Sequence, residues 1–488
     1  MDHPGSDCDI LVVGGGVNGA GIARDAAGRG HKVLLVERGD LAQATSSASS
    51  KLIHGGLRYL ENYQFRLVRE ALAEREVLLR MAPHIIWPLR FVLPHRPQMR
   101  PRWMIRAGLF LYDHLARRAT LPGAQAFRTH GHAFGQPLCQ ALTHAFAYSD
   151  AWVEDSRLVL LNARDAAQRG AEIATHTSFT HAARQPGYWE VTLSNGRALR
   201  ARAVVNAAGP WVAQALAAAH AKPEGGVRLI RGSHIVVPRL YAGEQAYILQ
   251  NDDRRVVFVI PYERDFSLIG TTDMPHTGDA ATATCTAEEA AYLCAAVSGQ
   301  FRQPVSPADI IWRYSGVRPL FDDGAENPSA VTRDYVLKLD LAGAPLLNIY
   351  GGKITTYRRL AEEAVGLVGA ALGRKGMAWT GGAMLPGGDL GGLSLAGFEA
   401  QMARRYPWLQ GLPRLVRTHG GELEAMLGGA RGPADMGENF GAGLTSREIS
   451  WMRDHEWARH ADDVLWRRSK LGLHLDARAQ ERVAAALG

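Results

Sequence analysis

Apolar positions near the start of the chain are grouped into three short blocks. Residues 10–13 form a wholly apolar run, which predicts a strand buried on both faces. Small and apolar residues from Val17 to about Ala27 predict a helix, and residues 31–36 predict a second buried strand. A strand, a helix and a strand in this order are typical of an α/β fold with parallel strands.

A glycine-rich loop joins the first strand to the helix. Gly14, Gly16 and Gly19 have the spacing G-x-G-x-x-G. The first glycine permits a tight turn, the second lets the backbone approach a pyrophosphate, and the third allows close helix–strand packing. The helix N-terminus offers unpaired N–H groups to the phosphates, and Glu37 at the end of the second strand can accept hydrogen bonds from a ribose. We therefore predict a dinucleotide site that contains Gly14, Gly15, Gly16, Asn18, Gly19 and Glu37.

Three later segments are predicted to reach the same dinucleotide. Positions 45–51 are mostly small and polar, a strand-like run at 203–207 enters a glycine turn, and a strand at 346–350 ends in Gly-Gly-Lys. A return so late in the chain favours a permanently held FAD over an exchanging nicotinamide cofactor. An ordinary linker and plain α/β core are the alternative interpretations of the first two segments. The predicted cofactor contacts here are Thr45, Ser46, Ser47, Ser50, Lys51, Leu52, Ala208, Gly209, Gly352, Lys353 and Thr355.

The pattern changes twice further along the chain. Residues 229–270 contain several strand-like runs, which predict a separate sheet that covers the site. After a glycine-rich linker at 386–392 the chain is predicted to be wholly helical, with helices at 398–406 and 457–471. Helix starts with a T-x-x-E capping box are predicted at Thr286 and Thr445.

Together these patterns predict an α/β protein (α+β overall) with three domains. A discontinuous, Rossmann-like FAD-binding domain is interleaved with an antiparallel-sheet domain that caps the substrate, and an all-helical domain follows. The length of 488 residues is sufficient for three cores. The predicted FAD-binding domain comprises residues 1–80, 150–225 and 330–385, the capping domain 81–149 and 226–329, and the helical domain 386–488.

Basic and aromatic residues are interleaved between Arg90 and Arg118. Prolines break the first half, so a regular helix can only follow Pro101. Such a helix could lie in a membrane interface, and an arginine-rich solvated face over an ordinary core is an equally good interpretation. The residues that would contact lipid are Trp103, Ile105, Leu109, Phe110 and Leu111, with Arg100, Arg102, Arg106, Arg117 and Arg118.

Composition narrows the classes of partner. The net charge is +7, from 55 basic and 48 acidic residues, which is too modest and scattered for nucleic acid but favours an anionic substrate or membrane surface. The four cysteines show neither C-x-x-C nor metal-ligand spacing, so we expect reduced thiols, a cytoplasmic protein and no metal. No apolar run approaches about 18 residues, so any membrane contact is expected to be peripheral.

Six segments spread over nearly the whole chain carry a resemblance to a known family. They are residues 45–60, 232–238, 269–273, 315–319, 351–358 and 462–472. They resemble the FAD-dependent, membrane-associated glycerol-3-phosphate dehydrogenases of aerobic bacteria. The resemblance implies the two-domain flavin fold shared with amino-acid oxidases, with a helical domain added.

The resemblance also implies an activity and a location. The expected reaction is oxidation of sn-glycerol 3-phosphate at C2 to dihydroxyacetone phosphate, with hydride transfer to FAD and electrons passed to ubiquinone or menaquinone. The expected protein is a homodimer, bound peripherally (monotopically) at the cytoplasmic face of the inner membrane. A soluble oxidase that reduces oxygen to peroxide, and a flavoprotein scaffold without turnover, are the alternatives.

This reaction requires cations that bind the phosphate. Arg58, Arg318 and Lys353 are the candidates, because a guanidinium can bind a phosphate through two N–H groups and a lysine acts as a point charge. Each could instead be a surface charge. The two arginines lie in glycine-rich or proline-flanked turns, which favours the functional interpretation.

The reaction also requires a base for the hydroxyl proton. His54 is the preferred candidate, because imidazole titrates near neutral pH and the family places this residue beside the flavin. His234 is the alternative. Tyr59 and Thr355 are candidates for orienting the substrate or the flavin.

Overall fold

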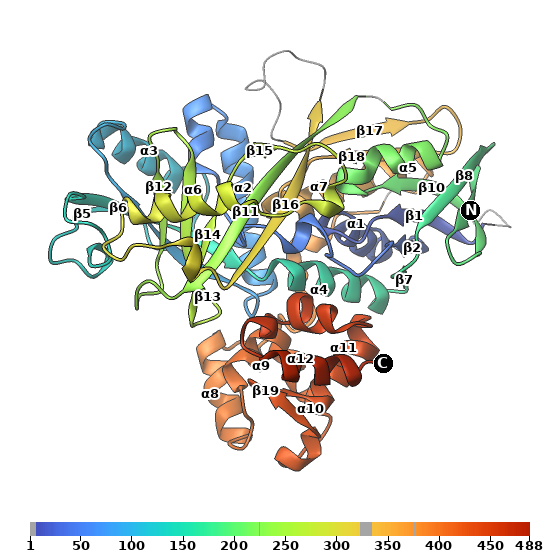
Figure 1. Ribbon diagram of the computed structural model, residues 1–488. Helices are drawn as coiled ribbons and strands as arrows, with labels where there is room; N and C mark the ends of the chain where they lie inside the picture. Colours follow the sequence, from blue (N-terminus) through green and yellow to red (C-terminus); the bar gives the residue numbers. More distant parts are fainter. Residues whose placement is uncertain (1–5, 224, 323–333, 375) are drawn as a thin grey trace.

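The structure is a computed structural model that describes residues 6–223, 225–322, 334–374 and 376–488. Figure 1 shows two sheets side by side, with the C-terminal helices beneath them. The predicted mixed α/β fold with a helical C-terminal part is confirmed. The exact domain boundaries stay a prediction, and the one between residues 329 and 330 lies outside the described residues.

The first sheet is built around β1, whose residues are almost all buried and apolar. β1 runs parallel to β10 and β2, with Ile10 opposite both Ala203 and Val33. The strand order is β17-β18-β10-β1-β2-β7, and the β8–β9 hairpin extends from β10. The strands are β1 (Cys8–Val13), β2 (Val33–Val36), β7 (Glu172–Ala174), β8 (Phe179–Gln185), β9 (Tyr188–Leu193), β10 (Ala198–Asn206), β17 (Val336–Asp340) and β18 (Leu346–Tyr350).

Helices cover both faces of this sheet. α1 (Val17–Gly28), α4 (Asp155–Gln168) and α7 (Tyr357–Ala371) share one core cluster with the strands. Alanines on α1 and α4 let these helices pack closely, and they are completely buried. α5 (Val212–Ala218) packs with the β8–β9 hairpin in a different cluster. The result is a three-layer arrangement with the sheet between helices.

The second sheet contains strands from both halves of the first 322 residues. Its order is β15-β11-β14-β13-β12-β4-β6-β3, with β16 beside β11 and β5 beside β6. The pairing is antiparallel except between β12 and β4, so the sheet is mixed. The strands are β3 (Leu52–Ile53), β4 (Ile86–Pro94), β5 (Gln125–Arg128), β6 (His144–Val153), β11 (Gly226–Pro238), β12 (Ala246–Gln250), β13 (Val256–Tyr262), β14 (Phe266–Gly270), β15 (Met274–Pro275) and β16 (Trp312–Asp322).

Three helices pack against the second sheet. α6 (Ala287–Ser298) begins with the predicted capping box, in which Thr286 and Glu289 bond to each other's backbone N–H groups. α2 (Phe65–Met81) and α3 (Arg102–His114) contribute to another core cluster of the same sheet. The apolar residues of α2 lie mostly on one face, which packs in the core. α3 begins directly after Pro101, as predicted.

The C-terminal part departs from its prediction in three places. α11 ends at Glu456 and Trp457 is left-handed (φ 56°), so the predicted helix at 457–471 is wrong; a π-helical turn covers Asp463–Arg468. The predicted capping box at Thr445 does not form, because Glu448 is buried against other groups. A short hairpin, β19–β20, is present. The elements are α8 (Leu395–Arg405), α9 (Leu412–His419), α10 (Leu423–Leu427), β19 (Asn439–Gly441), β20 (Leu444–Thr445), α11 (Ser446–Glu456) and α12 (Ala477–Ala485).

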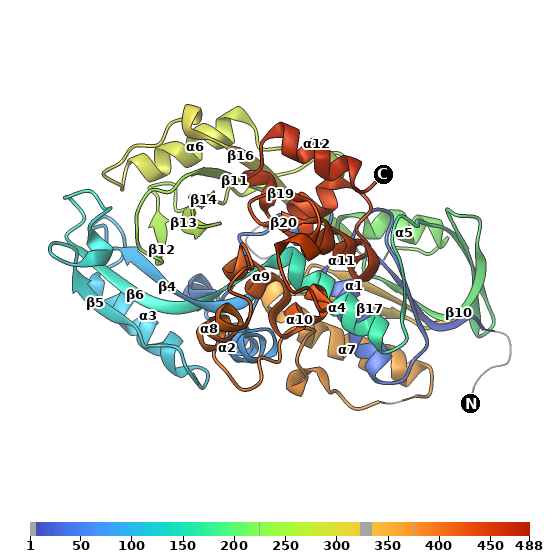
Figure 2. The same ribbon diagram turned by 90° about the horizontal axis from the view of Figure 1, so that it is seen from below.

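Buried ion pairs attach the C-terminal part to α4. Arg157 pairs with Glu456 at 2.7 Å, and Arg164 with Glu422 at 2.6 Å. Figure 2 shows the C-terminal helices from below, in front of the junction between the two sheets. Within the described ranges, every helix is too short or too polar to cross a membrane.

Candidate functional site

A cavity of about 1000 Å³ lies where the carboxyl ends of β1, β10 and β18 face the second sheet. Its wall includes the loops after these three strands and parts of β11 and β16. Ligands of open α/β sheets bind outside the carboxyl ends of the strands. The volume is at the upper end of the range for ligand sites, which suits a dinucleotide with a small second molecule.

The glycine-rich loop forms one wall of the cavity. Gly14 has a φ of 110°, and a Cβ at this residue would lie 2.5 Å from the carbonyl oxygen of Ala207. Gly16 is the N-cap of α1 and provides no side-chain cap, so the end of the helix stays open to an anion. The N–H of Val17 donates to Ser46 Oγ at 3.0 Å, which brings the hydroxyl-rich segment to the same place.

Glu37 and Asn18 supply polar atoms to this wall. The Glu37 carboxylate accepts hydrogen bonds from the N–H groups of Gly15 (2.6 Å) and Gly39 (2.9 Å), which fix it at the end of β2. Asn18 Nδ2 donates to the carbonyl of Gly351 at 3.1 Å, so α1 and the segment after β18 are joined. Asn18 Oδ1 is buried and has no hydrogen-bond donor within the described part of the chain.

Lys353 presents a buried ammonium to the other end of the cavity. Its Nζ lies 3.8 Å from the ring centroid of Tyr59, and both residues line the wall. Among the residues that the structure describes, Nζ has no hydrogen-bond acceptor. A buried charge without a partner is costly, so this position favours a bound anion.

Arg318 provides a second cation at the wall. Its Nη2 lies 2.8 Å from Asp273 Oδ1, and both side chains are about half exposed. The planar guanidinium has five N–H donors, so the pair with Asp273 leaves donors for another anion. Arg318 is therefore able to bind a phosphate without losing its carboxylate partner.

His54 lies in the wall with its backbone fixed. Its N–H donates to Thr355 Oγ1 at 3.2 Å, and the same hydroxyl lies 3.4 Å from the carbonyl of His54. Burial lowers the pKa of His54 below its usual value of 6.5, the carboxylate of Asp150 opposes this change, and Lys353 adds to it. His54 is therefore neutral at physiological pH and able to accept a proton.

His234 is a much weaker base. Burial, assisted by Lys51 and Arg318, lowers its pKa to about 3. Its Nε2 lies 2.8 Å from Ser50 Oγ, and its ring stacks on Tyr314 with centroids 4.8 Å apart. A base with so low a pKa has little driving force to accept a proton, so His54 is the better candidate for the base.

The structure brings most of the predicted residues together around the cavity. Three predicted residues lie outside its wall: Gly19, Lys51 and Arg58. Gly19 lies beneath the loop, where a Cβ would be 1.9 Å from the carbonyl oxygen of Gly14. The residues in the wall are Gly14, Gly15, Gly16, Asn18, Glu37, Thr45, Ser46, Ser47, Ser50, Leu52, His54, Tyr59, Ala208, Gly209, His234, Arg318, Gly352, Lys353 and Thr355.

The side chain of Lys51 has a different position from the one predicted. Its ammonium is fully buried, 2.8 Å from Asp155, and donates to the carbonyl of Ser47 at 3.1 Å, so it stabilises the hydroxyl-rich segment from behind. Arg58 is exposed on the short helix Leu57–Asn62. Its predicted contact with the phosphate stays a prediction.

Several residues of the wall are not predicted from the sequence. The guanidinium of Arg38 lies 3.8 Å from the ring centroid of Trp211. Trp312 and Trp466 stack with centroids 4.5 Å apart. Trp466 belongs to the C-terminal part, more than 150 residues from Trp312, and no local motif marks this pair.

Residues 9–358 match the family described as FAD dependent oxidoreductase. The chain belongs to the FAD-dependent oxidoreductase family. This protein is therefore an oxidoreductase whose cofactor is FAD, as the glycine-rich loop and the late strand predict. The donors at the start of α1, the carboxylate of Glu37 and the Oδ1 of Asn18, which has no donor among the residues that the structure describes, fit such a cofactor.

Similar proteins in this FAD-dependent family cover nearly the whole chain. A relative from Pseudomonas aeruginosa named glycerol-3-phosphate dehydrogenase is 53% identical, covering 98% of this chain and 94% of its own. A relative from Brucella abortus named D-erythritol 1-phosphate dehydrogenase is 49% identical, covering 96% and 95%. The solved glycerol-3-phosphate dehydrogenase from Bacillus halodurans, complexed with FAD, has a TM-score of 0.77 at 24% identity over 100% of this chain and 94% of that one. This last likeness shows the fold.

Proposed function

We propose that this FAD-dependent oxidoreductase oxidises sn-glycerol 3-phosphate at C2 to dihydroxyacetone phosphate. The observation that supports this most is the buried ammonium of Lys353, which lacks a hydrogen-bond acceptor within the described chain and lines the same cavity as neutral His54. A phosphate ester of a small alcohol requires such a cation and such a base. The relative that is 53% identical over almost the full length is named glycerol-3-phosphate dehydrogenase.

The proposed cofactor contacts follow the wall of the cavity. The open N-terminus of α1, with Ser46 beside it, would hold the pyrophosphate, and Glu37 would bind a ribose. The segment from Gly352 to Thr355 would hold the flavin. When bound, FAD supplies an acceptor for the hydrogen and electron pair that leave C2.

The proposed substrate contacts divide between binding and proton transfer. Lys353 and Arg318 bind the phosphate, one as a point charge and the other through planar N–H groups. Tyr59 supports the Lys353 ammonium through its ring face. The neutral imidazole of His54 accepts the proton of the C2 hydroxyl as the C2–H bond breaks.

D-Erythritol 1-phosphate is the second candidate substrate, because a relative with that name is 49% identical over nearly the whole chain. Both compounds carry a phosphate ester and a secondary hydroxyl, so the same two cations and base would act on either. The test compares kcat/KM for glycerol 3-phosphate, D-erythritol 1-phosphate and glycerol, with an artificial electron acceptor. We expect glycerol 3-phosphate to be best and glycerol to be very poor. A preference for the four-carbon ester would reassign the substrate.

We further propose that the electrons pass to a membrane quinone while the protein is bound to the membrane surface. α3 supports this, because Trp103 is 69% exposed and Phe110 is 61% exposed on its outer face. Arg102, Arg106 and Arg117 are exposed nearby. Such a surface suits an interface rich in anionic lipid. The cytoplasmic location and the homodimer expected from the sequence stay predictions.

The lipid surface in the structure differs from the predicted one in two details. Leu109 is only 2% exposed and packs in the core, so it does not contribute to this surface. Arg100 pairs with Glu61 at 2.9 Å and Arg118 with Asp113 at 3.5 Å, which reduces the charge that they offer to lipid. The remaining surface is smaller than predicted but keeps both its apolar and its basic residues.

The electron acceptor is tested with reduced enzyme on anionic vesicles that contain ubiquinone or menaquinone. We expect quinone to reoxidise the flavin much faster than oxygen does. Fast reoxidation by oxygen with stoichiometric peroxide, unchanged by quinone, would identify the protein as an oxidase.

A further inference from the structure

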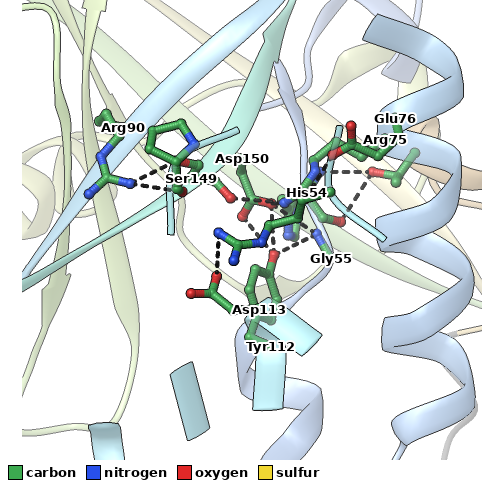
Figure 3. A network of polar contacts seen from close by, with 12 residues as sticks. His54, Gly55, Arg75, Glu76, Arg90, Tyr112, Asp113, Ser149 and Asp150 are labelled. Atoms are coloured by element: carbon green, nitrogen blue, oxygen red, sulfur yellow. Dashed lines mark hydrogen bonds and ion pairs between the residues drawn. The ribbon is translucent and has the colours of Figure 1, made fainter. Parts of the chain in front are cut away.

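A buried polar cluster lies behind His54, among residues that do not line the cavity. Tyr112 of α3 and Asp150 of β6 are 2% and 1% exposed. The hydroxyl of Tyr112 donates to the Asp150 carboxylate at 2.7 Å and accepts the N–H of Gly55 at 2.8 Å. Arg75 of α2 donates to the same carboxylate at 2.7 Å (Figure 3). The cluster therefore connects two surface helices to the residue that follows His54.

The cluster holds one side of a peptide group whose other side is held from the cavity. The N–H of the peptide between His54 and Gly55 donates to the Tyr112 hydroxyl at 2.8 Å and, at the longer distance of 3.4 Å, to Asp150 Oδ1. The carbonyl of this peptide lies 3.4 Å from the hydroxyl of Thr355. A Cβ at Gly55 would lie 2.7 Å from the Tyr112 hydroxyl, so a glycine is needed for this approach. The backbone that carries the His54 imidazole is thus fixed from two directions.

The cluster contains buried charged side chains that core packing alone does not require. A buried carboxylate and guanidinium are costly to desolvate, and apolar side chains of similar volume often stabilise a core better. Here Arg75 pairs with both Asp150 and Glu76, at 2.7 and 3.2 Å, so the two buried carboxyl groups share one cationic partner. This carboxylate raises the pKa of His54 against the effect of burial. The cluster thus acts on both the position and the basicity of His54.

We propose that Tyr112 and Asp150 are positioning residues that fix the peptide between His54 and Gly55 and thereby aim the His54 imidazole into the cavity. This inference rests on the proposed role of His54 as the base. The charged and titratable groups that face His54 and this cluster are Asp150 and Tyr148 from β6, Arg75 and Glu76 from α2, Tyr112 from α3 and Lys353 from the cavity wall.

The first test removes one hydroxyl. Tyr112→Phe keeps the buried ring and deletes the bond to Gly55. Tyr148→Phe is the matched control, because Tyr148 lies in the same core with its ring 5.5 Å from that of Tyr112, and within the described residues it makes no hydrogen bond to Gly55 or Asp150. We expect Tyr112→Phe to reduce the rate of flavin reduction by about tenfold, with little change in KM, because the phosphate contacts are separate. The control should retain the wild-type rate.

The second test changes the charge. Asp150→Asn removes the group that raises the pKa of His54, so the acid limb of the kcat/KM profile should move to lower pH. A purely structural role for Asp150 would lower the rate at every pH and leave the limb in place. That outcome would overturn the inference. If Asp150→Asn does not fold, the comparison of Tyr112→Phe with Tyr148→Phe still tests the proposal.

Two further readouts do not depend on turnover. In the flavin-loaded protein, NMR of labelled histidine should show a lower pKa for His54 in Asp150→Asn than in the wild type. Hydrogen exchange of the peptide that contains Gly55 should be about tenfold faster in Tyr112→Phe and unchanged in Tyr148→Phe. Unchanged values in both experiments would overturn the inference. If instead no phosphate ester reduces the flavin, the proposed function fails while these measurements still test the positioning of His54.

Discussion

Two lysines with buried ammonium groups have opposite surroundings. Lys51 lies 2.8 Å from Asp155 and stabilises the segment that it belongs to. Lys353 lies over the face of Tyr59 and has no hydrogen-bond acceptor in the part of the chain that the structure describes. Both follow runs of small residues in the sequence, so the sequence identified each as a candidate but could not show which one has a carboxylate partner. That difference depends on Asp155, a residue 104 positions away from Lys51.

The first prediction concerns the phosphate. Lys353→Gln should raise KM for glycerol 3-phosphate by one to two decades, because a charge-assisted contact contributes about 1.5–3 kcal/mol. Activity with glycerol, already poor, should change little. Lys222→Gln, which removes a charge from an exposed position, is the control. An equal loss on both substrates would show that Lys353 holds the flavin or the fold.

The second prediction concerns the cofactor. Glu37→Ala should weaken FAD retention, measured as flavin bound per protein after gel filtration, because a ribose contact contributes to binding in ground and transition states alike. The loaded fraction of the variant should be reduced by substrate at nearly the wild-type rate. Full flavin content with no reduction by substrate would contradict this role.

At the scale of elements, hydrophobic periodicity predicts that a helix or strand exists better than it predicts which residues of the element face the core, or where contacts with distant segments end it. α3 begins after Pro101 as predicted, yet Leu109 faces the core rather than lipid. The predicted helix at 457–471 fails because a local turn and a distant partner both shape that segment. Asp463 accepts the N–H groups of Arg459 and His460, which lie four and three residues before it, and this turn interrupts a continuous helix. Arg468 pairs with buried Asp40, which lies 428 residues away and leaves no local signal in the sequence.

The third prediction concerns the outer face of α3. Replacing Trp103 and Phe110 with serine should release the protein from anionic vesicles, while flavin reduction by substrate persists and quinone reduction falls. Salt should weaken the wild-type binding without abolishing it, because screening acts on charges, at about 1 kcal/mol per basic residue, and leaves apolar burial in place. A protein with serine at the exposed Met377 and Leu341 is the control. Unchanged co-sedimentation of the α3 variant would place the membrane contact elsewhere.

At the scale of the whole molecule, buried ion pairs hold the C-terminal part together and attach it to α4. Arg414 donates to both carboxylate oxygens of Glu448 at 2.7 Å, and His419 Nε2 lies 3.3 Å from the same group. The sequence indicated a separate helical part because a glycine-rich linker precedes it. It could not indicate that Trp466 of this part lines the cavity, because that contact exists only after the parts assemble.

The fourth prediction concerns the pH dependence of this assembly. Arg414 and His419 lower the pKa of Glu448 from 4.5 to about 2 against the effect of burial. Because the folded-state pKa is the lower one, the stabilisation is present above pH 4.5 and is lost as the pH falls toward 2. Glu448→Gln should therefore reduce the free energy of unfolding by about 3 kcal/mol at pH 7. In denaturant titrations the difference in unfolding free energy between the variant and the wild type should become smaller below pH 4.5. A difference that stays constant with pH would show that Glu448 does not link stability to pH.

In the proposed reaction, glycerol 3-phosphate is oxidised at C2 in the cavity, with FAD as the acceptor and His54 as the base. The most direct measurement is anaerobic stopped-flow absorbance of the flavin with glycerol 3-phosphate carrying hydrogen or deuterium at C2, for the wild type and His54→Gln. We expect one flavin to be bleached per substrate, more slowly with deuterium, and almost no bleaching in the variant despite full flavin content. A flavin that stays oxidised, or rates that are equal with both isotopes and in both proteins, would rule out this reaction.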